Sequence, residues 1–153
     1  MQPFHTEAIP VGTDRAVLQI SGEVDVYTAP QVRDRVIRLL ADGVRHVVAD
    51  LREVTFLDST GLGALVGSLK RVREQDGSLE LVVADGRIMT IFRVTGLDRV
   101  FALHPSFPDA IDDDQHWQAA LAREGRSTAE WCREHQLLLT PAVNPPRRRW
   151  GPG

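Results

Sequence analysis

The feature that most limits the possible folds is an alternation of strand-like and helix-like segments between residues 4 and 109. Short apolar runs of strand composition are followed by segments in which apolar residues recur at helical spacing. This alternation is typical of an α/β domain, in which helices cover a sheet. We therefore expect a small mixed β-sheet packed with about four helices, followed by a C-terminal helical extension.

The first part of the chain begins with a predicted β-hairpin. Its arms are residues 4–11 and 16–24, and the turn between them contains Gly, Thr and Asp. A helix is expected next, with Thr28 as its N-cap in a capping box with Gln31. The buried stripe of this helix should consist of Val32, Val36, Leu39 and Leu40.

The centre of the chain combines a strand, a sharp turn and a helix. An apolar strand is predicted over about residues 44–51, followed by a short loop. The eight residues 56–63, FLDSTGLG, come next, and from Leu62 to about Gln75 apolar residues recur at helical spacing. The hydroxyl of Ser59 should therefore lie at a helix N-terminus, where unpaired N–H groups and the helix dipole favour an anion such as phosphate.

Three further elements are predicted before residue 114. A buried strand should span residues 79–84, and a third helix around residues 88–92 should end at Gly96. Residues 100–103 are expected to form a last short strand, before a turn of helix at about residues 108–112.

Beyond Asp114 the composition shifts. Ser127 and Glu130 form a capping box that predicts a short helix, after another around Trp117. The apolar stripe of this helix would fit either against the main domain or into a groove of a partner. The stripe contains Trp131, Cys132, His135, Leu138 and Leu139. We predict a domain at residues 4–114, a helical extension at 115–140 and a disordered tail at 141–153.

Composition and charge exclude several classes of protein. The net charge of −3 gives no overall sign of nucleic-acid binding, and the basic cluster at residues 147–149 is interpreted as part of a solvated tail. The single cysteine, Cys132, cannot form an internal disulfide, and no apolar run approaches the roughly 20 residues of a membrane-spanning helix. We expect a soluble cytoplasmic protein without membrane insertion. The scattered histidines show no metal-ligand spacing, so no metal or cofactor is expected.

Simple structural roles compete with functional ones at the FLDSTGLG turn. Asp58 and Ser59 could serve only as helix caps. A catalytic serine is disfavoured because the sequence lacks a G-x-S-x-G elbow and a histidine in a recognisable arrangement. The glycines match neither a dinucleotide fingerprint nor a P-loop. Gly63 and Gly67 are expected instead to let the helix approach the sheet closely.

Three segments, in order along the chain, resemble the signature of STAS domains, and in particular of the bacterial anti-sigma factor antagonists. They are Gly22-Glu23-Val24-Asp25, the stretch from Val47 through FLDSTGLG, and Thr95-Gly96-Leu97-Asp98-Arg99-Val100-Phe101. The resemblance covers about residues 4–112. It implies a STAS-like fold and a regulatory binding protein that is not itself an enzyme.

The resemblance also implies a mode of action. In this family the unphosphorylated antagonist binds an anti-sigma factor that is also a serine kinase, and so frees a sigma factor for transcription. The kinase phosphorylates the serine that matches Ser59, with Thr60 as the weaker alternative, and a PP2C-type phosphatase reverses the step. The implied partner-binding residues are Asp25, Asp58, Ser59, Thr60, Gly61 and Leu62.

Two alternatives remain open at this point. The chain could be a STAS subunit of another assembly, in lipid transport or stress signalling, in which Ser59 is only structural. It could also be a small hydrolase that uses Ser59 as its nucleophile.

Overall fold

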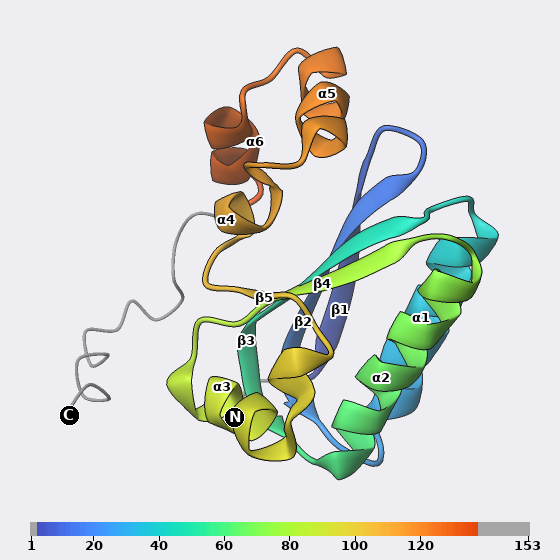
Figure 1. Ribbon diagram of the computed structural model, residues 1–153, viewed down its shortest axis with the longest axis vertical. Helices are drawn as coiled ribbons and strands as arrows, with labels where there is room; N and C mark the ends of the chain where they lie inside the picture. Colours follow the sequence, from blue (N-terminus) through green and yellow to red (C-terminus); the bar gives the residue numbers. More distant parts are fainter. Residues whose placement is uncertain (1–2, 138–153) are drawn as a thin grey trace.

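A five-stranded sheet organises the computed structural model, which describes residues 3–137 (Figure 1). The strands lie in chain order across the sheet, with β1 antiparallel to β2 and every other neighbouring pair parallel. They are β1 (His5–Val11), β2 (Arg15–Val24), β3 (His46–Leu57), β4 (Ser78–Val82) and β5 (Leu103–His104). The predicted α/β class, the opening hairpin and the mixed sheet are confirmed.

Six α-helices and one 3-10 turn accompany the sheet in the described residues. They are α1 (Ala29–Ala41), α2 (Ser59–Glu74), α3 (Gly86–Thr95), η1 (Leu97–Arg99), α4 (Phe107–Ile111), α5 (Gln115–Arg123) and α6 (Thr128–Glu134). Parallel neighbours need crossover connections, and α1 and α2 supply those from β2 to β3 and from β3 to β4. The two helices lie side by side along the sheet in Figure 1.

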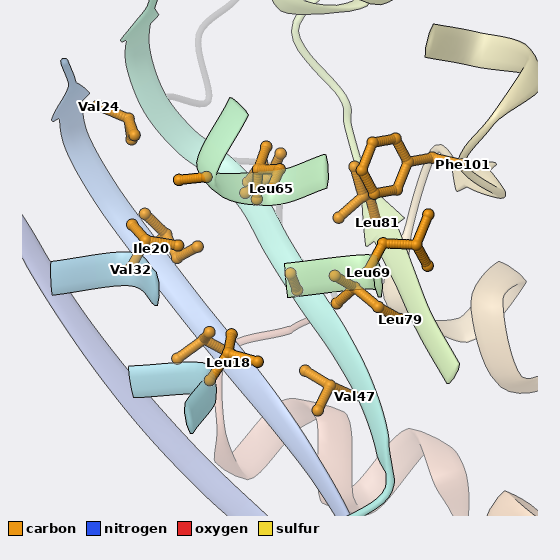
Figure 2. Close-up of a cluster of buried hydrophobic side chains, with 14 of the residues drawn as sticks. Leu18, Ile20, Val24, Val32, Val47, Leu65, Leu69, Leu79, Leu81 and Phe101 are labelled. Atoms are coloured by element: carbon orange, nitrogen blue, oxygen red, sulfur yellow. The ribbon is translucent and has the colours of Figure 1, made fainter. Parts of the chain in front are cut away.

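The first core lies between the sheet and helices α1 to α3. Alternate residues of β2, β3 and β4 point into it, because successive side chains of a strand face opposite sides. Figure 2 shows Leu18, Ile20, Val24, Val47, Leu79 and Leu81 of the sheet gathered against Val32, Leu65, Leu69 and Phe101. Full burial of one such side chain stabilises the fold by roughly 1.5–3 kcal/mol. The rings of Phe92 and Phe101 meet edge to face at 5.9 Å.

A second core lies on the opposite face of the sheet, under α4, α5 and α6. The strand residues that face it include Val11, Val17, Val48 and Val82. From the helices come Phe107, Trp117, Trp131, Cys132 and, just after α6, Leu137. The predicted stripe on α6 thus packs against the main domain and not away from it. Leu138, Leu139 and the predicted tail lie outside the described residues.

The length of β3 corrects one prediction. A loop was expected after Leu51, but β3 continues without a break to Leu57. Its second half pairs with the end of β2, with Val54 opposite Gly22 and Leu57 opposite Val24, across two register shifts. These irregularities disturb the alternation along the strand, which explains why the sequence pattern indicated a loop.

The last strand is also displaced from its expected position. It is β5, a two-residue strand at Leu103–His104, and the residues before it form η1 and the turn that follows. Phe101 is buried in the first core from this irregular segment. Its apolar character therefore reflects packing and not strand pairing.

The predicted capping box of Thr28 and Gln31 is wrong. Thr28 is the N-cap residue of α1, as predicted, but its side chain makes no cap hydrogen bond to the helix. Its hydroxyl donates to the carbonyl of Glu23 at 2.8 Å and accepts the N–H of Asp25 at 2.9 Å. The side chain thus closes the turn after β2. The second predicted capping box, at Ser127 and Glu130, is confirmed.

Candidate functional site

Ser59 is the first residue of α2, directly where β3 ends. Asp58 is the N-cap: its Oδ1 accepts the N–H of Gly61 at 2.9 Å, and its carbonyl accepts the N–H of Leu62 at 2.9 Å. The side chains of Ser59 and Thr60 are exposed. The first N–H groups of a helix have no acceptor within it, so this is an electropositive helix start with an open hydroxyl. The predicted place of Ser59 is confirmed, and the capping role belongs to Asp58.

A second loop lies beside this helix start. It follows β2, whose last residue, Val24, accepts the N–H of Asp58 at 3.3 Å through its carbonyl. In the loop, Asp25 Oδ1 accepts the N–H groups of Tyr27 at 2.9 Å and of Thr28 at 3.1 Å. Asp25 therefore fixes the shape of the loop. Its contact with a partner stays a prediction.

Gly61 is the residue that allows α2 to approach the sheet. A Cβ atom built on Gly61 would lie 2.7 Å from Leu57 Cδ1 and 2.8 Å from the carbonyl oxygen of Val24. At Gly63 and at Gly67 a Cβ atom would meet nothing within 4 Å. The expectation that Gly63 and Gly67 provide the close approach is therefore wrong, because Gly61 is the glycine of this helix turn that faces the strands.

The six predicted partner-binding residues divide by exposure. Ser59 and Thr60 are open, and Asp25 and Asp58 are partly buried. Gly61 and Leu62 are buried, and Leu62 belongs to the first core. Gly61 and Leu62 thus anchor the helix start, while the open hydroxyls are what a docking protein could touch.

Three exposed apolar side chains lie close in sequence to the ends of β2 and β3 and were missed in the sequence analysis. Tyr27 is 84% exposed and Val26 54% exposed, both in the loop after β2, and Phe56 near the end of β3 is 47% exposed. Phe56 lies opposite Glu23 in the pairing of the two strands. Apolar residues that follow the predicted strands at 16–24 and 44–51, outside either periodic pattern, were the available signal. Exposed aromatic and aliphatic side chains of this kind are typical of protein-docking surfaces.

The described residues give no support to a metal site or a serine hydrolase. Within residues 3–137 no group of three His, Cys, Asp or Glu side chains is placed to hold a metal ion. The nitrogens of His46, His104 and His135 pair with Ser78, Glu80 and the carbonyl of Trp131. None of these three histidines is thus placed as a base for Ser59.

Comparison with known proteins identifies the family and the fold. Residues 8–110 match the family model for the STAS domain. The chain therefore belongs to the STAS domain family. Curated relatives and solved structures that are similar to it include anti-sigma factor antagonists.

Two curated relatives and two solved structures illustrate the similarity. The anti-sigma-B factor antagonist of Bacillus subtilis (strain 168) is 41% identical over 80 residues, or 52% of this chain and 72% of the relative. That of Staphylococcus aureus (strain NCTC 8325 / PS 47) is 38% identical over 80 residues, or 52% of this chain and 74% of the relative. The crystal structure of an anti-sigma factor antagonist from Mycobacterium paratuberculosis has a TM-score of 0.65 and 28% identity, covering 72% of this chain and 92% of that one.

The Bacillus protein SpoIIAA, solved in its phosphorylated form, shares the fold. Its TM-score is 0.56 at 20% identity, and the match covers 71% of this chain and 97% of that one.

Among the helices of residues 3–137, none has the length and apolar character that crossing a membrane requires.

Proposed function

We propose that this protein is a cytoplasmic anti-sigma factor antagonist whose docking surface is centred on the unmodified hydroxyl of Ser59. In this form it binds an anti-sigma factor with serine kinase activity and so releases a sigma factor. It acts as a binding module and not as an enzyme. The observation that carries the proposal is the open Ser59 hydroxyl on the first turn of α2, in a chain whose relatives are anti-sigma factor antagonists.

Phosphorylation of Ser59 is the proposed switch, with Thr60 as the weaker acceptor. A phosphoryl group adds a charge of roughly −1.5 to −2 at neutral pH. At a helix start, the free N–H groups and the helix dipole stabilise that charge, so the fold tolerates it. In support, a protein of the same fold, SpoIIAA, has been solved in a phosphorylated form.

The same charge opposes the bound state. A partner seated on Ser59 would have to bury a dianion next to the carboxylate of Asp58, and an uncompensated buried charge costs about 3–5 kcal/mol. Because about 1.4 kcal/mol changes an affinity tenfold, this cost is sufficient to separate the complex. A PP2C-type phosphatase would restore binding by removing the phosphate.

The apolar residues beside Ser59 give the partner contact area. Tyr27, Val26 and Phe56 are exposed, and Asp25 holds the loop that carries the first two. Aromatic side chains are enriched at protein interfaces because they bury a large area with few rotatable bonds. We therefore propose that the partner docks across the loop after β2 and the turn between β3 and α2, and not on α2 alone.

The first test is phosphosite mapping with the anti-sigma factor kinase of the same organism and ATP. Wild type should gain the mass of one phosphoryl group, Ser59→Ala should gain none, and the matched variant Thr60→Ala should gain one. A wild type that stays unmodified would count against the proposal. If only Thr60→Ala fails to gain the phosphoryl mass, the acceptor is Thr60 and not Ser59.

The second test measures binding of the same kinase by calorimetry. Ser59→Asp should weaken binding at least tenfold, since even a single added carboxylate must be desolvated next to Asp58. Ser59→Ala, which adds no charge, should bind like wild type. Equal affinities for Ser59→Asp and wild type would remove the electrostatic mechanism.

A further inference from the structure

Helices α5 and α6 cover a face of the sheet that would otherwise be exposed and apolar. Both helices lie beyond residue 110, where the STAS match ends. Strands β1 to β4 contribute buried valines and isoleucine to this face, and Trp131 and Leu137 from the extension are 1% and 0% exposed. A contiguous apolar patch of this kind is rarely left open in a monomeric protein. The extension therefore covers apolar surface of the sheet that would otherwise be exposed to water.

Aromatic rings join the extension to the STAS-matched residues. The ring of Phe107 in α4 lies 5.8 Å from the ring of Trp117, edge to face, and 5.6 Å from the ring of Trp131. Phe107 is thus packed between the two tryptophans of α5 and α6. Both helices are fixed against the same residue of the domain.

A buried ion pair in β3 also depends on the extension. Arg52 Nε and Nη2 donate to the two carboxylate oxygens of Asp50, each at 2.9 Å, and both side chains are buried. Arg52 Nη2 also donates to the carbonyl oxygen of Gln136 at 2.9 Å, just beyond the C-terminal end of α6. A buried guanidinium is costly unless acceptors surround it, so the residue just after α6 stabilises Arg52 by supplying an acceptor.

Two contacts hold α5 and its C-cap residue against the first hairpin. The guanidinium carbon of Arg15, in β2, lies 5.5 Å from the centre of the Trp117 ring. The N–H of Gly12, in the turn of the first hairpin, donates to Glu124 at 3.2 Å. The extension is thus tied to β2, to β3 and to the hairpin turn.

Residues 115–137 cover the second face of the sheet. We infer that they unfold together with the STAS domain as one cooperative unit. The boundary predicted at residue 114 then divides the sequence but not the folded unit. The second face is closed to other proteins and to a second copy of this chain. In Figure 1, α5 and α6 lie at the end of the molecule opposite to the start of α2, so the extension leaves Ser59 open. This inference does not rest on the proposed function.

The positions of the tryptophans allow a direct test with the full chain. All three, Trp117, Trp131 and Trp150, lie beyond residue 114. In a Trp150→Phe variant, fluorescence reports on α5 and α6, whereas far-UV circular dichroism reports mainly on the longer helices and the sheet. We expect urea unfolding to give one midpoint by both signals. A fluorescence transition at lower urea than the circular dichroism transition would overturn the inference.

A matched pair of variants in the same background sharpens this test. Leu137→Ala removes a fully buried side chain and should lower the midpoints of both signals together, with Leu137→Val as the milder change if the alanine variant does not fold. Arg133→Ala changes an exposed residue of α6 and should leave both midpoints in place. If the change at Leu137 shifts the fluorescence midpoint alone, or shifts neither, the extension is a separate unit and the inference fails.

Discussion

The two faces of the sheet are closed by different means. On the first face, the long helices α1 and α2 bury mainly aliphatic side chains. On the second face, three short helices bury aromatic rings above the Asp50–Arg52 ion pair. Short helices are marginal in isolation, so the second layer depends on its tertiary contacts. The difference teaches that an appended segment can become part of a domain through a few large side chains and a few specific polar contacts.

The largest expected effect compares one aromatic residue from each face. Phe92→Ala and Trp131→Ala each remove a fully buried ring, and each should reduce the free energy of unfolding by about 3–5 kcal/mol. Urea unfolding followed by circular dichroism measures both. A loss below about 1 kcal/mol for Trp131→Ala alone would make the second layer dispensable and break the comparison.

The buried ion pair of Asp50 and Arg52 is a feature of the second face. Asp50→Asn leaves the buried Arg52 guanidinium without its carboxylate, and should cost about 3 kcal/mol. The double variant Asp50→Leu/Arg52→Met removes both charges and should recover most of that loss. Equal stability of Asp50→Asn and wild type in urea would show that the pair contributes only geometry.

A smaller effect tests how closely α2 is docked on the first face. Gly61→Ala should cost about 1–3 kcal/mol, because its Cβ would overlap the Val24 carbonyl and the Leu57 side chain. The control is Gly63→Ala on the same helix, which meets no atom and should stabilise the protein by roughly 0.5–1 kcal/mol. Thermal unfolding gives both values. Similar effects at the two glycines would contradict the close approach at Gly61.

The smallest expected effect is a dependence of stability on pH that arises from His46, the first residue of β3. Burial, and next the nearby Arg15, lower the pKa of His46, while Asp14 and Asp114 oppose and His116 adds to the lowering. A lowered pKa means that the folded state favours the neutral ring. The related stability is complete above the ordinary pKa of about 6.5 and is lost as the pH falls through the folded value.

His46→Gln should remove this dependence. Urea unfolding gives the loss in free energy of unfolding between pH 7 and pH 5 for each protein. This loss should be larger in wild type than in the variant, by less than about 1 kcal/mol, because the side chain is only partly buried. A steeper loss of stability in the variant than in wild type would reverse the assigned sign.

Much of the fold was predictable because it depends on local pattern. The alternation of strands and helices, the position of Ser59 and the Ser127–Glu130 capping box follow from spacing and cap chemistry. The failures depend on contacts between distant residues. The hydroxyl of Thr28 bonds the end of β2 and not α1, and the choice of Gly61 over Gly63 depends on where Val24 lies.

The second face and the rim of the site were less accessible to prediction for the same reason. Arg52 and Gln136 are 84 positions apart, and neither residue type indicates that they meet. The exposure of Tyr27 and Phe56 depends on where β2 and β3 end in space. The position of Ser59 at the start of α2 was therefore predictable from its motif, whereas the exposure of these apolar residues required the structure.

The burial of Cys132 has a practical consequence. Cys132 is a fully buried residue of α6, and burial raises the pKa of its thiol to about 11, so little thiolate forms at neutral pH. Toward maleimide reagents the folded protein should behave as if it had no cysteine. A cysteine placed at an exposed residue such as Val94, which is 80% exposed, could then carry a single dye without removal of the native thiol. Docking of a partner could be followed by that dye in an otherwise unaltered protein.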